Sequence, residues 1–308
     1  MSERIMGIPG DTLVHIGTTA SVPAELEHVL PRIKQLHKMG ITGEGSIYSI
    51  NDTGYFNHKD LPPVKEALDF SGSSSVFDKQ GHGTHCRGIT WSIAPGAIGM
   101  SMKVLGDNGS GSTYGINRGR VAAAKAGAHF ISESLGDNGG PRIAEDIAAY
   151  QEAYKNGVSL CFAALGNAGF NGRNSIGRPG SYNDQNFGIG ALMPDFKTPA
   201  NFSSGGVQAG WAAPGVNIMS TLPGNRWGRM SGTSMATPWM CGLLCLIRQI
   251  RKEQGYPDLH GVESWTSFFL ENKLFIDLLT PGHDHKTGYG LIDIEKVVDW
   301  CIDTTLMA

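Results

Sequence analysis

The stretch SIYSINDTG at residues 46–54 is the starting point for predicting the fold. Residues 46–50 are rich in β-prone side chains, so a strand is predicted there. This strand leads directly into Asp52 and Gly54, residue types that are typical of a turn. In a parallel sheet, ligands bind at the edge formed by the carboxyl ends of the strands. Asp52 is therefore either an ordinary turn residue or a carboxylate of a functional site.

Further strands and helices are predicted on the carboxyl side of this stretch. Short apolar runs predict strands at residues 97–105, 129–135, 159–164 and 187–192, and amphipathic spacing predicts helices at residues 116–126 and 143–156. Strands that alternate with helices at this spacing require crossover connections and form a mainly parallel sheet covered on both faces. We therefore predict an α/β protein with three α/β/α layers.

The chain is predicted to contain one large domain, residues 41–308, preceded by an extension, residues 1–40. In the extension, apolar residues follow a helical spacing within residues 24–39, namely Leu26, Val29, Leu30, Ile33 and Leu36. This segment is too short to fold alone, and a regulatory role is one interpretation of it.

The composition excludes several classes of protein. Among 308 residues the formal net charge is -3 and charges of both signs are interspersed, so neither a nucleic acid nor a membrane surface is an expected partner. The N-terminus has no apolar run of the length of a signal peptide, so the protein is expected to be cytoplasmic. Five cysteines without a CxxC pair indicate reduced thiols. Cys241 and Cys245, one helical turn apart, are either metal ligands or, as base rates favour, core residues.

Two glycine-containing motifs carry side chains with possible chemistry. The sequence GHGTHCRG at residues 81–88 places imidazoles in a glycine-rich turn, where a histidine is more often an ordinary surface residue. The sequence MSGTSMATP at residues 230–238 places Ser234 in the first turn of a predicted helix, where free N–H groups favour an oxyanion. Taken alone, this second motif is more often a helix N-cap than a functional site.

A third motif, LGNAG at residues 165–169, ends a predicted strand in a glycine-flanked amide. Asn167 is either a turn residue or a hydrogen-bond donor to a developing oxyanion.

Together, these segments resemble the subtilisin family of serine proteases, and the resemblance spans about residues 41–298. It implies that Ser234 is the nucleophile, His85 the general base and Asp52 the buried partner of His85. Asn167 and the backbone N–H of Ser234 would form the oxyanion hole. Residues 41–308 would then be the catalytic domain.

The same resemblance implies where a peptide substrate binds. The substrate main chain would add a strand between two segments of this chain, and Gly177 would form the floor of the main specificity pocket and leave room for a large apolar group. The two segments consist of Gly109, Ser110, Gly111, Ser134, Leu135 and Gly136. Broad specificity is expected, because backbone hydrogen bonds ignore side-chain identity.

Three features depart from the secreted members of the family. The segment before Asp52 is short, and Ile8 and Pro9 resemble a short extension that blocks the cleft in the intracellular branch. Asp60 resembles a calcium ligand, but the loop that supplies its companions is missing, so a strong calcium site is not expected and the chemistry requires no cofactor. Cys86 directly follows His85, as in thiol-sensitive members, and is also consistent with a small buried apolar residue.

The sequence therefore predicts a cytoplasmic serine endopeptidase of low specificity that acts on proteins or peptides. Two rival hypotheses are a catalytically silent relative that binds peptides and a processing enzyme dedicated to one partner protein.

Overall fold

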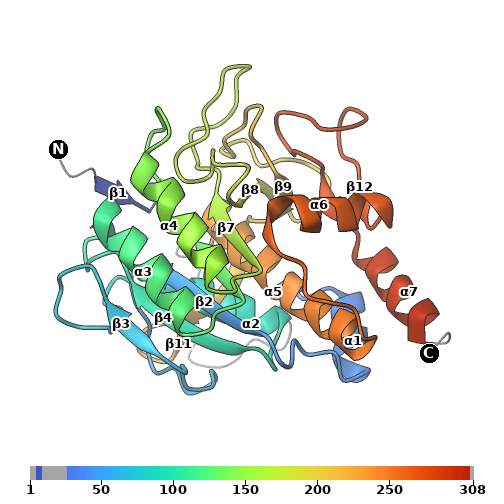
Figure 1. Ribbon diagram of the computed structural model, residues 1–308, viewed down its shortest axis with the longest axis horizontal. Coiled ribbons are helices and arrows are strands. Elements are labelled where there is room, and N and C mark those ends of the chain that lie inside the picture. The colour runs from blue at the N-terminus through green and yellow to red at the C-terminus, as the bar shows by residue number, and fades with distance from the viewer. Residues whose placement is uncertain (1–4, 9–25, 306–308) are drawn as a thin grey trace.

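The structure is a computed structural model that describes residues 5–8 and 26–305. Within these residues, the centre of the molecule is a nine-stranded sheet (Figure 1). In spatial order its strands are β12 (Phe275–Ile276), β13 (Leu291–Ile292), β9 (Trp211–Pro214), β8 (Phe187–Leu192), β7 (Leu160–Ala164), β6 (Phe130–Glu133), β2 (Ile47–Asp52), β4 (Ile98–Lys103) and β3 (Ala67–Asp69). All neighbouring strands are parallel except β12 and β13. The predicted mainly parallel sheet is confirmed.

Helices cover both faces of this sheet. They are α1 (Pro31–Lys38), α2 (His82–Ile93), α3 (Thr113–Lys125), α4 (Ala144–Lys155), α5 (Thr233–Glu253), α6 (Gly261–Glu271) and α7 (Ile294–Thr305). Helix α3 packs against α4 and contacts β2 and β4, whereas α2 packs against α5, which contacts β6 to β9. Figure 1 shows the α3–α4 pair in front of the sheet and the α2–α5 pair behind it. The three-layer α/β/α prediction is confirmed.

Two short antiparallel ribbons lie outside the main sheet. One pairs β1 (Ile5–Gly7) with β5 (Ser110–Ser112), and the other pairs β10 (Ile218–Leu222) with β11 (Arg226–Met230). The first ribbon joins the N-terminal segment to the domain, and the second lies against α2.

The long helix α5 forms the centre of the largest hydrophobic core. Nearly all of its residues are buried, including Trp239, Leu243 and Ile247. A helix that is buried on every side belongs in the middle of a domain rather than on its surface. Because α5 begins at Thr233, its buried position fixes its first turn relative to the sheet.

Part of the predicted extension belongs to this same core. Val29, Ile33 and Leu36 are buried in one cluster with residues of the predicted domain 41–308. The helix predicted within residues 24–39 begins only at Pro31. Leu30 is extended, with φ -59 and ψ 155, because a residue before proline is disfavoured in the helical conformation. Val29, Ile33 and Leu36 of the predicted extension thus pack into the core formed by residues 41–308.

The parallel sheet brings three strand ends to one edge. Strand β2 ends at Asp52, β6 is followed by Ser134, and β7 is followed by the loop that contains Asn167. Helices α2 and α5 both begin close to this edge, so their first turns meet the strand ends.

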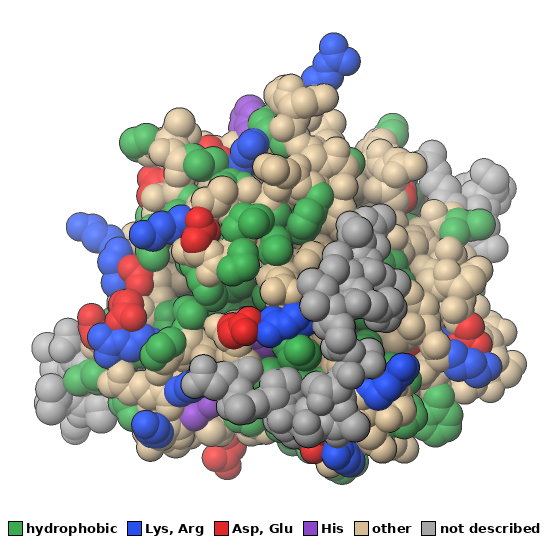
Figure 2. Space-filling view, turned by 180° about the vertical axis from the view of Figure 1, so that it is seen from behind, with side chains coloured by type: hydrophobic (Ala, Val, Ile, Leu, Met, Phe, Trp, Pro, Cys, Tyr) green, Lys and Arg blue, Asp and Glu red, His purple; other side chains and the backbone are tan. Residues whose placement is uncertain are grey.

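None of the helices of the described residues combines the length and the apolar composition of a membrane span. On the face shown in Figure 2, basic and acidic side chains are interspersed.

Candidate active site

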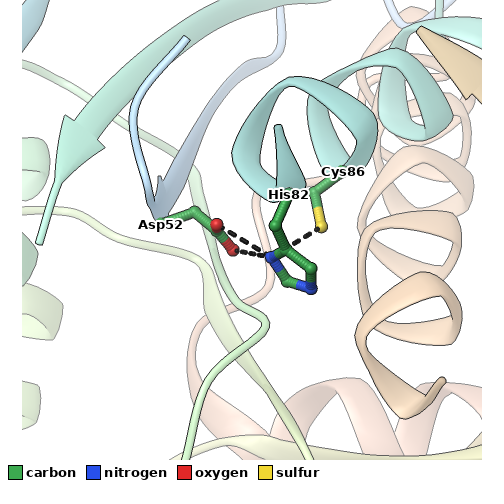
Figure 3. A group of neighbouring side chains, drawn as sticks. All are labelled: Asp52, His82 and Cys86. Atoms are coloured by element: carbon green, nitrogen blue, oxygen red, sulfur yellow. Dashed lines mark hydrogen bonds and ion pairs between the residues drawn. The ribbon is translucent and has the colours of Figure 1, made fainter. Parts of the chain in front are cut away.

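A buried carboxylate and an imidazole form the centre of the site. Asp52 is the last residue of β2 and His82 is the first residue of α2. The Nδ1 atom of His82 lies 2.9 Å from Oδ1 and 3.0 Å from Oδ2 of Asp52, and both side chains are almost fully buried (Figure 3). A carboxylate in this position holds the imidazole in the tautomer that carries its proton on Nδ1. The second ring nitrogen points away from Asp52 in Figure 3.

The prediction that His85 is the partner of Asp52 is wrong. The Nε2 atom of His85 lies 3.0 Å from the carbonyl oxygen of Gly228, and its side chain is fully buried. Burial lowers the pKa of His85 to about 3, which keeps its ring neutral. His85 lies three residues further along α2, about 4.5 Å along the helix axis. Its side chain therefore contacts β11 and not the end of β2.

Close backbone packing explains why the first of the two histidines faces Asp52. A Cβ atom on Gly83 would lie only 2.4 Å from the carbonyl oxygen of Gly54 and 3.2 Å from Cβ of Asp52. The first turn of α2 therefore rests directly on the end of β2. The position of this glycine next to His82 becomes informative only once α2 is seen to rest on β2.

Asp78 fixes this arrangement, and no sequence motif had indicated it. Its Oδ1 accepts hydrogen bonds from Thr53 Oγ1 at 2.9 Å and Gly81 N at 2.7 Å. Its Oδ2 accepts hydrogen bonds from Thr84 N at 2.9 Å and Thr84 Oγ1 at 2.6 Å. Asp78 thus ties the residue after Asp52 to the first turn of the helix that carries His82. Burial raises the pKa of Asp78, whereas these hydrogen bonds favour its charged form.

Ser234 lies in the first turn of α5 and is buried. Pro238, four residues later, has no N–H group to donate to the carbonyl oxygen of Ser234. Two other donors bind this oxygen instead, Ser134 Oγ at 2.8 Å and Cys86 Sγ at 3.5 Å. The Ser234 hydroxyl lies 3.5 Å from the carbonyl oxygen of Ser134. The start of α5 is therefore bound both to the helix that carries His82 and to the segment after β6.

Cys86 lies in α2, one turn after His82, where α2 packs against α5. Its Sγ atom lies 3.9 Å from His82 Nδ1, and a dashed line marks this contact in Figure 3. Among the described residues, Asp52, His82 and Cys86 are the only three potential metal-binding side chains that gather within 4.8 Å. Burial raises the pKa of the Cys86 thiol, so it is protonated at neutral pH.

The side-chain amide of Asn167 has a defined orientation. Its Oδ1 accepts hydrogen bonds from Thr233 N at 3.0 Å and from Thr233 Oγ1 at 2.9 Å. Because the oxygen end faces Thr233, the NH₂ end is directed away from it. Asn167 is thereby bound to the residue that precedes Ser234.

The chain's own N-terminal segment lies where the substrate strand was predicted. In β1, Met6 pairs with Gly111 and Gly7 with Ser110. On the other side, Gly7 and Gly136 exchange two hydrogen bonds of 2.9 Å. Ile8 N donates to the carbonyl oxygen of Gly109 at 3.1 Å. Ile8, one of the two residues predicted to block the cleft, thus lies beside it. Pro9, the other, lies outside the described residues.

The predicted edges are therefore both engaged by an extended chain. Met6 is buried and belongs to the same hydrophobic cluster as Leu105, Ile116 and Leu135. Leu135 lies between Ser134 and Gly136, and its side chain is fully buried.

A pocket of about 560 Å³ continues from this cleft to Gly177. Its lining includes Gly136, Asp137, Asn167 and Ala168. Gly177 was predicted to leave room for a substrate side chain, but a Cβ atom there would lie 2.1 Å from the carbonyl oxygen of Asp137. Glycine is required at position 177 because the floor of the pocket at this residue lies very close to the wall at Asp137.

The carboxylate of Asp60, the residue that resembles a calcium ligand, contacts other side chains of the protein. Its Oδ2 accepts a hydrogen bond from Trp227 Nε1 at 3.0 Å and lies 3.7 Å from His58 Nδ1. In the described part of the chain no cluster of three acidic, histidine or cysteine side chains surrounds it. Asp60 is thus held by protein contacts, and the absence of a strong calcium site stays a prediction.

The described cysteines contain no disulfide. Cys86, Cys161, Cys241 and Cys245 are free and buried. Cys241 and Cys245 lie in the core around α5, as expected for packing residues.

Comparison with known proteins identifies the family. Residues 43–290 match the subtilase family. Alkaline elastase YaB of Bacillus sp. (strain YaB) is 32% identical over 289 residues, which cover 91% of this chain and 71% of that protein. Subtilisin Savinase of Lederbergia lenta is 33% identical over 268 residues, which cover 84% of this chain and 93% of that protein. Subtilisin DY of Bacillus licheniformis is 33% identical over 279 residues, which cover 86% and 96%, respectively. The chain belongs to the subtilase family and is a serine endopeptidase that acts on proteins or peptides.

Proposed function

We propose that this endopeptidase cleaves proteins with little sequence selectivity, through Ser234, His82 and Asp52. The observation that carries the proposal is the contact of His82 Nδ1 with both carboxylate oxygens of Asp52, at 2.9 and 3.0 Å. This contact defines the tautomer and leaves Nε2 as the basic nitrogen. The contact between His82 and Asp52 lies near the start of α5, which carries Ser234 of the MSGTSMATP motif.

In the proposed reaction, His82 Nε2 takes the proton of the Ser234 hydroxyl as the oxygen attacks the scissile carbonyl. The Asp52 carboxylate stabilises the imidazolium that forms. His82 then returns the proton to the leaving amine, and an acyl-enzyme remains on Ser234. Water, activated by the same nitrogen, hydrolyses the acyl-enzyme and restores the hydroxyl.

The oxyanion that forms in each step needs hydrogen-bond donors at a fixed position. Thr233 holds the Asn167 oxygen, so the amide NH₂ is the end presented to the reacting carbonyl. The backbone N–H of Ser234, at the start of α5, is the second donor. Removal of one such side-chain donor lowers turnover about 10²- to 10³-fold in subtilisin, a relative of this chain.

The N-terminal strand supports the proposed mode of substrate binding. Ile5–Gly7 forms backbone hydrogen bonds on both sides, to β5 and to Gly136. A substrate in this position gains affinity from groups that every peptide has, and this is the physical basis for broad specificity. The pocket that ends at Gly177 would accept a large apolar side chain next to the cleaved bond.

The same strand supports a proposal about regulation. Substrate and N-terminal segment would compete for one cleft, so the segment would inhibit the intact chain. Glu27, the second described residue after the gap in the described chain, forms a bidentate ion pair with Arg229 of β11 at 2.8 and 2.9 Å. The described residues on either side of residues 9–25, Ile8 and Glu27, are thus both held by contacts with the domain. Restraint of this kind suits an enzyme that works in the cytoplasm, the proposed location.

Two rival functions predict different cleavage results from those of the proposed function. A silent peptide-binding relative would not hydrolyse denatured casein, and a dedicated processing enzyme would cleave few members of a peptide library. The test is therefore to incubate the full chain and its Ser234→Ala variant with casein and then with the library. The proposal requires hydrolysis by the wild type alone, at many sites with large apolar residues before the cleaved bond. Equal hydrolysis by Ser234→Ala would refute the assignment of the nucleophile.

A further inference from the structure

A buried ion pair lies directly behind the pocket that ends at Gly177. Arg178 is only 2% exposed and forms an ion pair with Asp137, whose side chain is 12% exposed. Its Nε donates to Asp137 Oδ1 at 3.3 Å and a terminal nitrogen donates to Oδ2. Its other terminal nitrogen donates to the carbonyl oxygen of Pro141 at 2.8 Å. The proposed reaction uses neither of the two charges.

The pair joins the wall of the pocket to its floor. Asp137 N donates to the carbonyl oxygen of Arg178 at 3.0 Å, and Arg178 N donates back to Asp137 Oδ1 at 3.1 Å. A Cβ atom on Gly177 would lie 2.1 Å from the carbonyl oxygen of Asp137, so no side chain fits between the floor and the wall. Asp137 therefore cannot move away from the pocket without breaking several hydrogen bonds at once.

The two charges lie at different depths. Asp137 is the only ionisable side chain among the described residues that line the pocket, and Arg178 is not among them. Asp137 therefore borders the pocket, and the Arg178 guanidinium neutralises its carboxylate from outside the pocket lining. In a partly enclosed site, an unneutralised carboxylate attracts a cation much more strongly than in water. An aspartate in the main pocket of trypsin selects cationic side chains in this way.

We propose that Arg178 is a specificity-determining residue that, by neutralising Asp137, keeps the main pocket selective for apolar side chains and unselective for lysine or arginine. This inference rests on the proposed function, because it assumes that the pocket at Gly177 receives the side chain before the cleaved bond. It assigns Arg178 an effect on charge selectivity without contact between its guanidinium and the substrate.

The experiment compares peptides that differ only at the residue before the cleaved bond. One peptide carries lysine and the other norleucine, which has the same length without the ammonium group. The ratio of their kcat/KM values is independent of the fraction of enzyme whose cleft is open, because that fraction affects both peptides equally. Arg178→Leu is expected to raise the lysine-to-norleucine ratio about tenfold, which corresponds to one new charge-assisted hydrogen bond. This increase should shrink at high ionic strength.

Two variants serve as controls. Arg142→Leu removes a positive charge from the same region, but Arg142 forms an exposed ion pair with Asp184 away from the pocket. It should leave the ratio unchanged. Adding Asp137→Asn to Arg178→Leu should return the ratio to the wild-type value, because it removes the carboxylate that attracts lysine.

The single variant Asp137→Asn provides an independent test if Arg178→Leu fails to fold. It leaves Arg178 without its counter-charge, so the lysine-to-norleucine ratio should fall below the wild-type value. An unchanged ratio in a folded Arg178→Leu or Asp137→Asn variant would overturn the inference, as would an equal rise in Arg142→Leu. Failure of both the wild type and a chain without residues 1–8 to cleave either peptide would instead refute the proposed function.

Discussion

Gly7 and Gly136 exchange two backbone hydrogen bonds of 2.9 Å, which place the N-terminal segment of the chain in its own cleft. Gly136 belongs to the edge along which a substrate main chain is proposed to bind. Because one edge cannot pair with two strands, the segment and a substrate exclude each other.

Deletion of residues 1–8 is therefore expected to raise kcat/KM for a short peptide, since the competing strand is removed. The variant Gly7→Pro, which loses the N–H that donates to Gly136, should act in the same direction with a smaller effect. A synthetic peptide with the sequence of residues 1–12 should inhibit the truncated enzyme competitively. The contrary result is full activity in an intact chain whose N-terminus has been verified by mass spectrometry.

The two histidines of the GHGTHCRG motif are expected to differ sharply on substitution. His82→Ala should lower kcat by about 10⁶-fold, the scale known for triad residues that act as a unit. His85→Gln should retain most of the activity of its folded fraction, because His85 binds the Gly228 carbonyl and not Asp52, and it should lower the thermal midpoint. Both variants are compared by peptide hydrolysis and by thermal unfolding. Loss of catalysis on the His85 substitution with an unchanged midpoint would restore His85 as the base.

Mercuric ion is expected to inhibit the enzyme through Cys86, and excess thiol should restore activity. The Sγ atom lies 3.9 Å from His82 Nδ1, so a metal adduct there displaces the imidazole. A displacement of about an ångström is enough to lower the rate about 10²-fold. Large alkylating reagents should react slowly because the thiol is buried and protonated.

The control for this prediction is Cys86→Val, which retains Cys161, Cys241 and Cys245 in their buried positions. The variant should keep most of its activity and resist mercury. Equal sensitivity of wild type and variant would show that another cysteine is responsible.

Acid is expected to destabilise the fold below pH 6.5 through two buried histidines. Burial lowers the pKa of His28 to about 4 and that of His85 to about 3, against 6.5 in an unfolded chain. Between pH 6.5 and about 4 the unfolded state thus binds more protons, so the free energy of unfolding is largest above pH 6.5 and falls as the pH is lowered. Each histidine contributes up to about 1.4 kcal/mol per pH unit in this window.

Urea unfolding of the Ser234→Ala variant, which prevents self-digestion, measures this dependence. His28→Asn in the same background should reduce the slope of the free energy against pH by one histidine's contribution, because its imidazole no longer titrates. Identical slopes with and without His28 would exclude a role for this residue in acid unfolding.

Local sequence patterns determined most of the architecture. Alternating apolar runs predicted β2, β4, β6, β7 and β8 to within a few residues, because short buried strands need continuous β-prone side chains wherever they lie. The residue types of Asp52, Asn167 and Ser234 are also local information. Asp52 ends a strand, Asn167 follows one and Ser234 lies at the start of a helix, and nearby glycines allow sharp turns. Their place at one edge of the sheet could therefore be predicted.

Tertiary structure alone decided which side chains meet at this edge. His82 and His85 have the same chemistry within one helix, and the choice between them depends on where α2 rests against β2, which Gly83 and Asp78 determine. The pairing of Asp137 with Arg178 likewise joins residues 41 positions apart. Hydrogen bonds and ion pairs need their partners within a few tenths of an ångström, whereas sequence periodicity defines only which face of an element is buried. Only the packing of whole elements against one another supplies that precision.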